Sequence, residues 1–414
     1  MVPSFISEDL AKKILIIGKS INFLRQVCHD HTPLWSPSLR LWFTTESGEV
    51  TFSSMTGSSL QSVVAQTYTE TSRHLLQIMN TKYSFGKHLQ AIRKYLLLGQ
   101  GDLIRHLMDL LAQSSSKPAV SLYLHNLTGT LETAIRATNA QFEDPDILKR
   151  LDVQKLEPSL QDQGWDVFSL QYHVDGPIST VFTAENMLTY LKVFNFLWRA
   201  KRVQYYLSHV WNEQTAHYRS LQSIPDAYCN SVYWQVMECN WDSLLKKVRE
   251  AEDLDQIISA HDTFLQQITS QSLLNTDGQP LLSLLRMLFD LIISFREKQT
   301  SMLATALGEV ERRRDWDLQS LSRERQGVWG VREKEEEGEM EMRASFAEET
   351  VPKLHSEFAV LYDLFKDKVV DFMHKLTAHS EQKLRFLCFR LDFNEFYSSS
   401  SSELRSTSFI RKMK

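Results

Sequence analysis

The hydrophobic period changes once, from that of a strand to that of a helix, within residues 164–203, GWDVFSLQYHVDGPISTVFTAENMLTYLKVFNFLWRAKRV. Between Phe168 and Val174, apolar residues alternate with polar ones, which predicts a strand. Asp175-Gly176-Pro177 favours a turn, and residues 178–182 are expected to return as a short partner strand. We therefore expect one small β-hairpin near residues 165–182.

A long helix is expected to follow, with Thr183 as its N-cap and Glu185 in its first turn. A broad apolar face would be formed by Met187, Tyr190, Leu191, Phe194, Leu197 and Trp198. A polar and basic stripe occupies the other side, at Lys192, Asn195, Arg199, Arg202, Tyr206 and His209. Aromatic residues at helical spacing usually form core, and a solvated outer face explains the stripe as well as a partner surface does.

Helical periodicity extends over most of the remaining chain. It predicts a helix over residues 9–28 capped by Ser7, and a pair of helices within 88–111 that is interrupted at Gly99 and Gly101, with Asp102 as the second cap. Further helices are expected over 122–141, 241–272, 280–320, 346–378 and 380–389. Residues 33–60 are expected to be a long loop, 144–163 a polar connection, and the charge-dense 321–345 a solvated helix end or disordered loop. The predicted fold class is all-α, with elongated helical bundles and one small β-hairpin.

Composition narrows the function classes. The net charge of −5 argues against a general nucleic-acid binder, and no stretch approaches the roughly 20 apolar residues of a membrane-spanning helix. The four cysteines form no CxxC pair, and the first residues do not read as a secretory signal. We expect a cytoplasmic protein with reduced thiols, binding neither nucleic acid nor membrane.

No catalytic motif stands out. Gly18-Lys19-Ser20 imitates the end of a phosphate-binding loop, but Lys13 stands where the loop requires glycine. The chain has no HExxH and no GxSxG. We expect no enzyme activity, no cofactor and no metal site, although catalytic carboxylates that only the fold brings together would leave no motif in the sequence.

Several long stretches resemble the gamma-tubulin complex component family, in the family's order. They are ILIIGKSINFLRQVCHDHTP (14–33), YLLLGQGDLIRHLMDLL (95–111), HNLTGTLETAIRATNAQF (125–142), GWDVFSLQYHVDGPISTVF (164–182), FNFLWRAKR (194–202) and RFLCFRLDFNEFY (385–397). The resemblance covers nearly the whole chain and is weakest over residues 35–60 and the tail.

The resemblance implies a scaffold subunit of the gamma-tubulin complex that binds gamma-tubulin and supports microtubule nucleation. It implies three regions: 1–87 as the end of the N-terminal family domain, 88–397 as the C-terminal gamma-tubulin-binding domain, and 398–414 as a disordered tail. Partners would be gamma-tubulin and other complex components, especially component 2, at cytoplasmic microtubule-organising centres such as the centrosome and spindle pole.

The expected partner surface combines the helical stripe with the last resembling stretch. Its residues would be Lys192, Asn195, Arg199, Arg202, Arg385, Arg390, Asp392, Asn394 and Tyr397. An exposed cationic face would guide an acidic tubulin into place, so reversing the charges of Arg199 and Arg202 is expected to weaken binding with little loss of stability.

Two departures from the family pattern matter. Most of the family's N-terminal half has no counterpart here, so lateral assembly is an open question. Between Arg219 and Trp241 the chain is shorter than the long helix that the family implies, and we expect an exposed apolar patch and poor solubility without gamma-tubulin. The alternative is a generic helical adaptor without a tubulin partner; the lack of a 30–50-residue repeat weakens its solenoid form.

Overall fold

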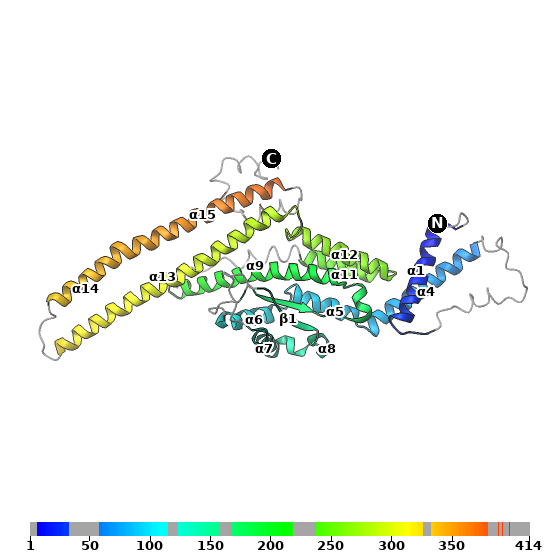
Figure 1. Ribbon diagram of the computed structural model, residues 1–414, viewed down its shortest axis with the longest axis horizontal. Coiled ribbons are helices and arrows are strands. Elements are labelled where there is room, and N and C mark those ends of the chain that lie inside the picture. The colour runs from blue at the N-terminus through cyan, green and yellow to red at the C-terminus, as the bar shows by residue number, and fades with distance from the viewer. Residues whose placement is uncertain are drawn as a thin grey trace, which may run out of the picture. The chain divides into compact units, whose positions relative to one another are not determined.

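The computed structural model describes residues 6–32, 58–114, 123–157, 165, 167–217, 237–325, 333–379, 388, 391 and 397. The chain divides into two compact units, one of residues 1–198 and 233–272, the other of residues 199–232 and 273–414. Helices dominate both units, and the described residues include one two-stranded antiparallel sheet (Figure 1). The predicted all-α class with one small hairpin is confirmed.

The first unit begins with two helices that pack against each other, α1 (Glu8–Gln26) and α4 (Ser58–Thr81). Ser7 caps α1 as predicted, because its Oγ accepts a hydrogen bond from the Leu10 amide at 3.4 Å. At the other end of α1, the Asp30 carboxylate lies 2.7 Å from Nε2 of His74 on α4. The hydrogen bond from His74 holds the pKa of Asp30 below its usual value.

The predicted helix–turn–helix consists of α5 (Phe85–Ala91), the π-helix η1 (Ile92–Leu96) and α6 (Gly101–Ser114). Gly99 donates its amide hydrogen to the Arg93 carbonyl at 3.0 Å, and a Cβ at Gly99 would lie 2.8 Å from that oxygen. The turn therefore needs glycine at this position. Asp102 lies inside the first turn of α6 rather than before it, and its carboxylate accepts from the Asn139 amide instead.

The next elements are α7 (Leu124–Ala137), η3 (Asn139–Phe142), α8 (Pro145–Leu148), β1 (Leu151–Lys155) and β2 (Phe168–Tyr172). The strand over β2 was predicted, but its partner was not: β1 pairs with it in antiparallel register, with Leu151 opposite Tyr172. Residues 178–182 form no strand. Gly176–Thr180 is the 3-10 helix η4, in which Pro177 lacks an amide hydrogen and the Val181 amide bonds to Ile178 at 3.0 Å.

The long helix α9 (Ala184–His217) starts in the first unit, and Thr183 caps it as predicted: its Oγ1 accepts from the Asn186 amide at 3.2 Å. The apolar face of α9 closes an aromatic core, in which the Trp198 ring centroid lies 5.0 Å from that of Phe168 and 5.8 Å from that of Phe194. The helices α11 (Cys239–Glu250) and α12 (Leu254–Gln271) complete this unit.

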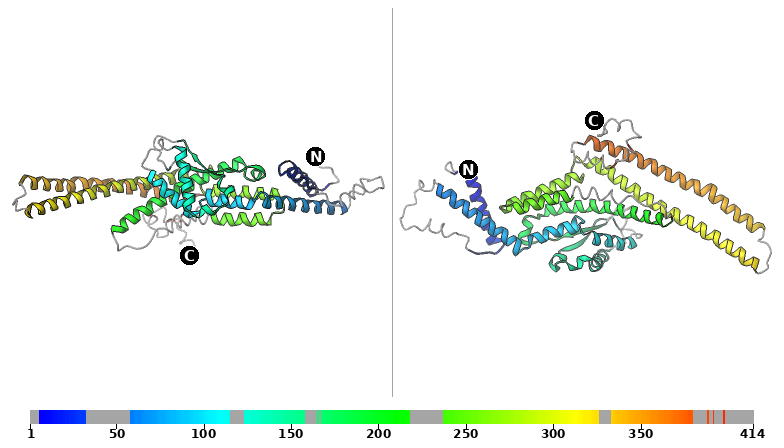
Figure 2. Two further views of the ribbon diagram at one scale, coloured as in Figure 1. Left: turned by 90° about the horizontal axis from the view of Figure 1, so that it is seen from below. Right: turned by 180° about the vertical axis from the view of Figure 1, so that it is seen from behind.

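The second unit holds the rest of α9 and a long helical hairpin. Its first arm is α13 (Gln279–Arg325), 47 residues or about 70 Å long. Its second arm consists of α14 (Glu333–Ser345), the π-helix η6 (Phe346–Thr350) and α15 (Val351–Ala378). The arms run side by side in all views (Figures 1 and 2). The prediction of a solvated helix end or loop over 321–345 is therefore wrong for most of that range.

Several predictions lie outside the described residues. These are residues 33–57 of the loop predicted over 33–60, the serine-rich tail, most of the helix over 380–389, and the shortened region through residue 236 with its apolar residues. The last three residues of that predicted loop belong to α4 instead.

Candidate partner-binding surface

The stripe on α9 starts in the first unit with Lys192 and Asn195. Lys192 is exposed and forms no ion pair among the residues described. Asn195 is half-buried, and its Oδ1 accepts a hydrogen bond from the Ser169 hydroxyl on β2 at 2.8 Å. Lys192 is therefore available to a partner, whereas Asn195 also ties the helix to the sheet.

Arg199 belongs to the second unit and is engaged within it. Its guanidinium donates to Oδ1 of Asp290 on α13 at 2.5 Å. Both side chains remain partly exposed, so solvent screens the pair and its contribution to stability is small. A partner carboxylate could still compete for this guanidinium.

Arg202 and Tyr206 do not belong to an exposed stripe. Arg202 is only 2% exposed and Tyr206 only 3%. The Arg202 guanidinium lies 5.3 Å from the Tyr206 ring centroid, and Arg296 of α13 lies 4.0 Å from the same ring. The expected harmless charge reversal at Arg202 is contradicted, because it would place a carboxylate in a buried, aromatic environment.

In the second half of the predicted surface, Tyr397 is the one residue that the structure describes, and nearby Cys388 is described as well. Cys388 is buried, with its Sγ 3.8 Å from the Met373 carbonyl oxygen of α15, and Tyr397 is half-buried. Arg385, Arg390, Asp392 and Asn394 lie outside the described residues.

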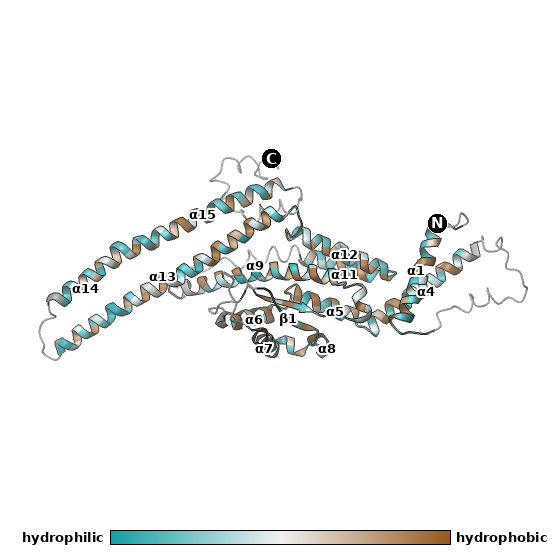
Figure 3. Cartoon of the chain, viewed as in Figure 1, coloured by the Kyte–Doolittle hydropathy of each residue, from teal (hydrophilic) through white to brown (hydrophobic). Residues whose placement is uncertain are grey.

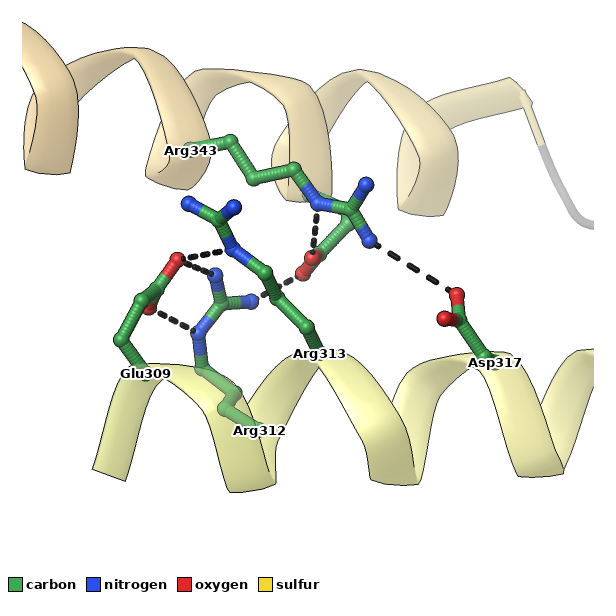
Figure 4. Close-up of polar contacts among 6 residues, drawn as sticks. Glu309, Arg312, Arg313, Asp317 and Arg343 are labelled. Carbon is green, nitrogen blue, oxygen red and sulfur yellow. Dashed lines mark hydrogen bonds and ion pairs between the residues drawn. The ribbon is translucent and has the colours of Figure 1, made fainter. Parts of the chain in front are cut away.

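A charged cluster between α13 and α14 was not anticipated from the sequence (Figure 4). Glu309 accepts from Arg313 at 2.6 Å and from Arg312 at 2.9 Å, and Arg343 donates to Glu339 at 2.7 Å. Arg312 also pairs with Glu339 across the two helices. Arg343 reaches Asp317 at 3.8 Å. We call these six residues the hairpin clasp.

Glu339 is the centre of the hairpin clasp, since it is only 4% exposed. Burial raises the pKa of this carboxyl, but hydrogen bonds from Arg343 and Arg312 outweigh burial and hold the pKa below its usual value. Arg312 likewise lowers the pKa of Glu309. The i,i+4 spacings of Glu309 with Arg313 and of Glu339 with Arg343 were visible in the sequence, but not the contact across the helices.

Other chemistry is limited in the part of the chain that the structure describes. No group of three His, Cys, Asp or Glu side chains there could hold a metal ion. The phosphate-loop imitation Gly18-Lys19-Ser20 lies within α1, where Lys19 approaches Asp255 at 3.7 Å and Ser20 is buried. No described helix is long and apolar enough to span a membrane.

Two units of packed helices with one small sheet define an all-α protein. Two family models cover most of it: "Gamma tubulin complex component N-terminal" matches residues 1–82 and "Gamma tubulin complex component C-terminal" matches residues 86–397. The chain therefore belongs to the gamma tubulin complex component family.

Relatives come from distant organisms. The chain is 46% identical to "Gamma-tubulin complex component 3" of Homo sapiens and 45% identical to "Gamma-tubulin complex component 3 homolog" of Xenopus laevis, over 98% of the chain and 47% of each relative. It is 33% identical to "Spindle pole body component alp6" of Schizosaccharomyces pombe, over 96% of the chain and 48% of that protein. The chain thus spans about half the length of these curated relatives.

Proposed function

We propose that this chain is a gamma-tubulin-binding scaffold subunit of the gamma-tubulin complex and supports microtubule nucleation. The observation that carries the proposal is the match of the C-terminal family model to residues 86–397, which include the described elements from η1 to α15 and all but the first residue of α5. The names of its relatives, gamma-tubulin complex component and spindle pole body component, favour action at cytoplasmic microtubule-organising centres, the centrosome and the spindle pole.

The proposal includes a division of labour along the chain. Residues 1–87 would be the end of the N-terminal family domain, 88–397 the gamma-tubulin-binding domain, and 398–414 a tail. Other complex components, especially component 2, would be further partners, whereas nucleic acid and membrane would not. The role would be structural rather than enzymatic.

The binding surface is proposed in two parts, each within its own unit. In the first unit Lys192 would contact the partner, with Asn195 beside it. In the second unit Arg199 would contact the partner, joined by Arg385, Arg390, Asp392, Asn394 and Tyr397. Because Arg202 is buried, it would position the helix by stacking on Tyr206 rather than touch the partner.

Co-purification with gamma-tubulin at moderate salt tests the proposal. We expect the purified chain to retain gamma-tubulin, and Lys192→Glu to weaken retention severalfold, on the order of what one exposed charge contributes. Lys247→Glu is a matched control, because Lys247 is an exposed lysine of the same unit on α11.

Failure to retain gamma-tubulin, by a chain whose circular dichroism shows a folded helical protein, would favour a generic helical adaptor. If the Lys192→Glu and Lys247→Glu variants retain gamma-tubulin equally well, the proposed function would stand, but Lys192 would not belong to the binding surface.

A further inference from the structure

The distal half of α13 carries an uncovered apolar row. Leu307, Val310, Leu318 and Leu321 are between 50% and 60% exposed. At 100° per residue they lie within one narrow sector of the helix, with the exposed Arg314 midway. In Figure 3, hydrophobic turns recur along α13 among hydrophilic ones. We call these five residues the distal row.

The distal row continues a face of α13 that is covered closer to the base of the hairpin. Arg296 lies five helical turns before Arg314, and so points in the same direction. Tyr206 of α9 covers Arg296, with the guanidinium 4.0 Å from the ring centroid. Near the base of the hairpin, this face of α13 therefore contacts α9 through Arg296. Around Arg314 the same face lies open.

The hairpin cannot cover the distal row itself. In the hairpin clasp, Arg312 and Asp317 of α13 pair with residues of α14 (Figure 4). At 100° per residue, their mean direction lies about 130° from that of the distal row. Turning the distal row inwards would break the ion pairs of Glu339, which is buried, and an unpaired buried carboxylate is costly.

We propose that the distal row is a docking site for an amphipathic helix of a partner protein, which carries an acidic residue opposite Arg314. Successive residues of the distal row, Arg314 included, are three, four, four and three positions apart, the helical spacing at which amphipathic helices place their contacts. Arg314 forms no ion pair among the described residues, so its guanidinium could donate hydrogen bonds to a carboxylate of the partner.

A second copy of the chain fits less well. The distal row is symmetric about Arg314, with apolar residues four and seven positions away on the two sides. Antiparallel pairing of two copies in that register would place Arg314 against Arg314, and like charges oppose such pairing. An acidic residue in the partner removes this conflict.

Two synthetic peptides of about three heptads test the proposal with the full chain. Both carry leucine at positions that mirror the distal row; one has glutamate midway and the other has lysine. Fluorescence anisotropy should show that the glutamate peptide binds at least about threefold more tightly. Arg314→Glu should reverse this preference, and Val310→Glu with Leu318→Glu should weaken binding about tenfold or more.

The control variant is Val360→Glu, since Val360 on α15 is 67% exposed and lies outside the distal row. It should leave peptide binding unchanged, and circular dichroism melting should show every variant folded. Equal binding of the two peptides, or an equal loss with Val360→Glu, would overturn the proposal. If the unaltered chain self-associates and the double variant Val310→Glu with Leu318→Glu does not, the distal row binds a second copy of the chain and the proposal is overturned. If that double variant is unfolded, the proposal is judged by the single variant Arg314→Glu, which must reverse the preference between the two peptides.

Discussion

Arg199 and Arg202 are three positions apart on α9, yet their surroundings differ. Arg199→Ala should lower the free energy of unfolding by less than about 1 kcal/mol, because its pair with Asp290 is partly exposed. Arg202→Ala should cost about 2–3 kcal/mol, because it removes a buried cation–π contact and the packing of the side-chain stem. Urea denaturation of both variants measures the difference. Equal losses of unfolding free energy in the two variants would show that Arg202 is not buried against Tyr206.

His261 provides a second test at the level of one residue. It is 1% exposed, its Nε2 lies 2.9 Å from the Tyr190 hydroxyl, and its Nδ1 lies 3.5 Å from Nδ2 of Asn186. Burial lowers its pKa to about 4. Between that value and the ordinary 6.5 the unfolded chain binds more protons, so this part of the stability is complete above about pH 6.5 and falls as pH is lowered towards 4.

We expect the loss to reach about 3 kcal/mol near pH 4, and His261→Gln to remove this part of the slope. His125→Gln, at an exposed histidine of α7, is the matched control for the substitution itself. Stability measured by denaturant titration at several pH values decides the matter. Parallel pH profiles for His261→Gln and the unaltered chain would contradict the burial of a neutral imidazole.

At the scale of elements, Asp253 joins α12 to α4. Its Oδ1 accepts from the Gln256 amide at 2.8 Å and caps α12, while its Oδ2 accepts from the Tyr68 hydroxyl at 2.5 Å. Tyr68→Phe removes one hydrogen bond and should cost about 1 kcal/mol. Asp253→Ala removes the cap as well and should cost about 2 kcal/mol or more. Thermal melting of the two variants compares them, and an equal cost would show that the cap contributes nothing.

The hairpin of the second unit has an apolar base and an ionic tip. Leu281, Leu288 and Phe372 are buried near the base, whereas the tip is held by the hairpin clasp. Glu339→Gln should deprive Arg312 and Arg343 of a charged partner and speed amide exchange over residues 309–317 and 335–343. About 1 M salt should act similarly on the partly exposed pairs, because the screening length falls to about 3 Å.

Glu335→Gln is the matched control for the clasp. Glu335 lies on the same helix, and its pair with Arg323 is exposed on both sides, so exchange should barely change. Hydrogen exchange followed by mass spectrometry separates the two variants. Unchanged exchange at the tip in Glu339→Gln would show that the clasp does not hold it.

The helices and strands also show which features can be predicted from sequence patterns. The cap at Thr183, the apolar face of α9 and the strand at Phe168–Tyr172 follow from local spacing, and the structure confirms them. The pairing of β2 with Leu151–Lys155 does not follow from local spacing, because tertiary packing selects the partner strand. In the sequence, residues 144–163 looked like a polar connection. Tyr206, on which Arg202 stacks, is contacted by Arg296 of α13, 90 residues later, and no helical period on α9 can reveal that contact.

At the scale of the whole molecule, the proposed gamma-tubulin-binding function rests on membership of the family. The C-terminal family model extends over residues in both compact units, so neither unit alone represents the proposed gamma-tubulin-binding domain. The chain covers about half of its relatives, and the proposal is therefore tested with this chain and not by analogy with theirs.

Sedimentation velocity of the purified chain mixed with purified gamma-tubulin at moderate salt is the best single test of gamma-tubulin binding by this chain. We predict a complex that sediments faster than either protein alone, and whose amount falls when Lys192 is changed to Glu but not when Lys247 is. Independent sedimentation of the two proteins at micromolar concentration, with the chain folded, would show that this chain is not a gamma-tubulin-binding subunit.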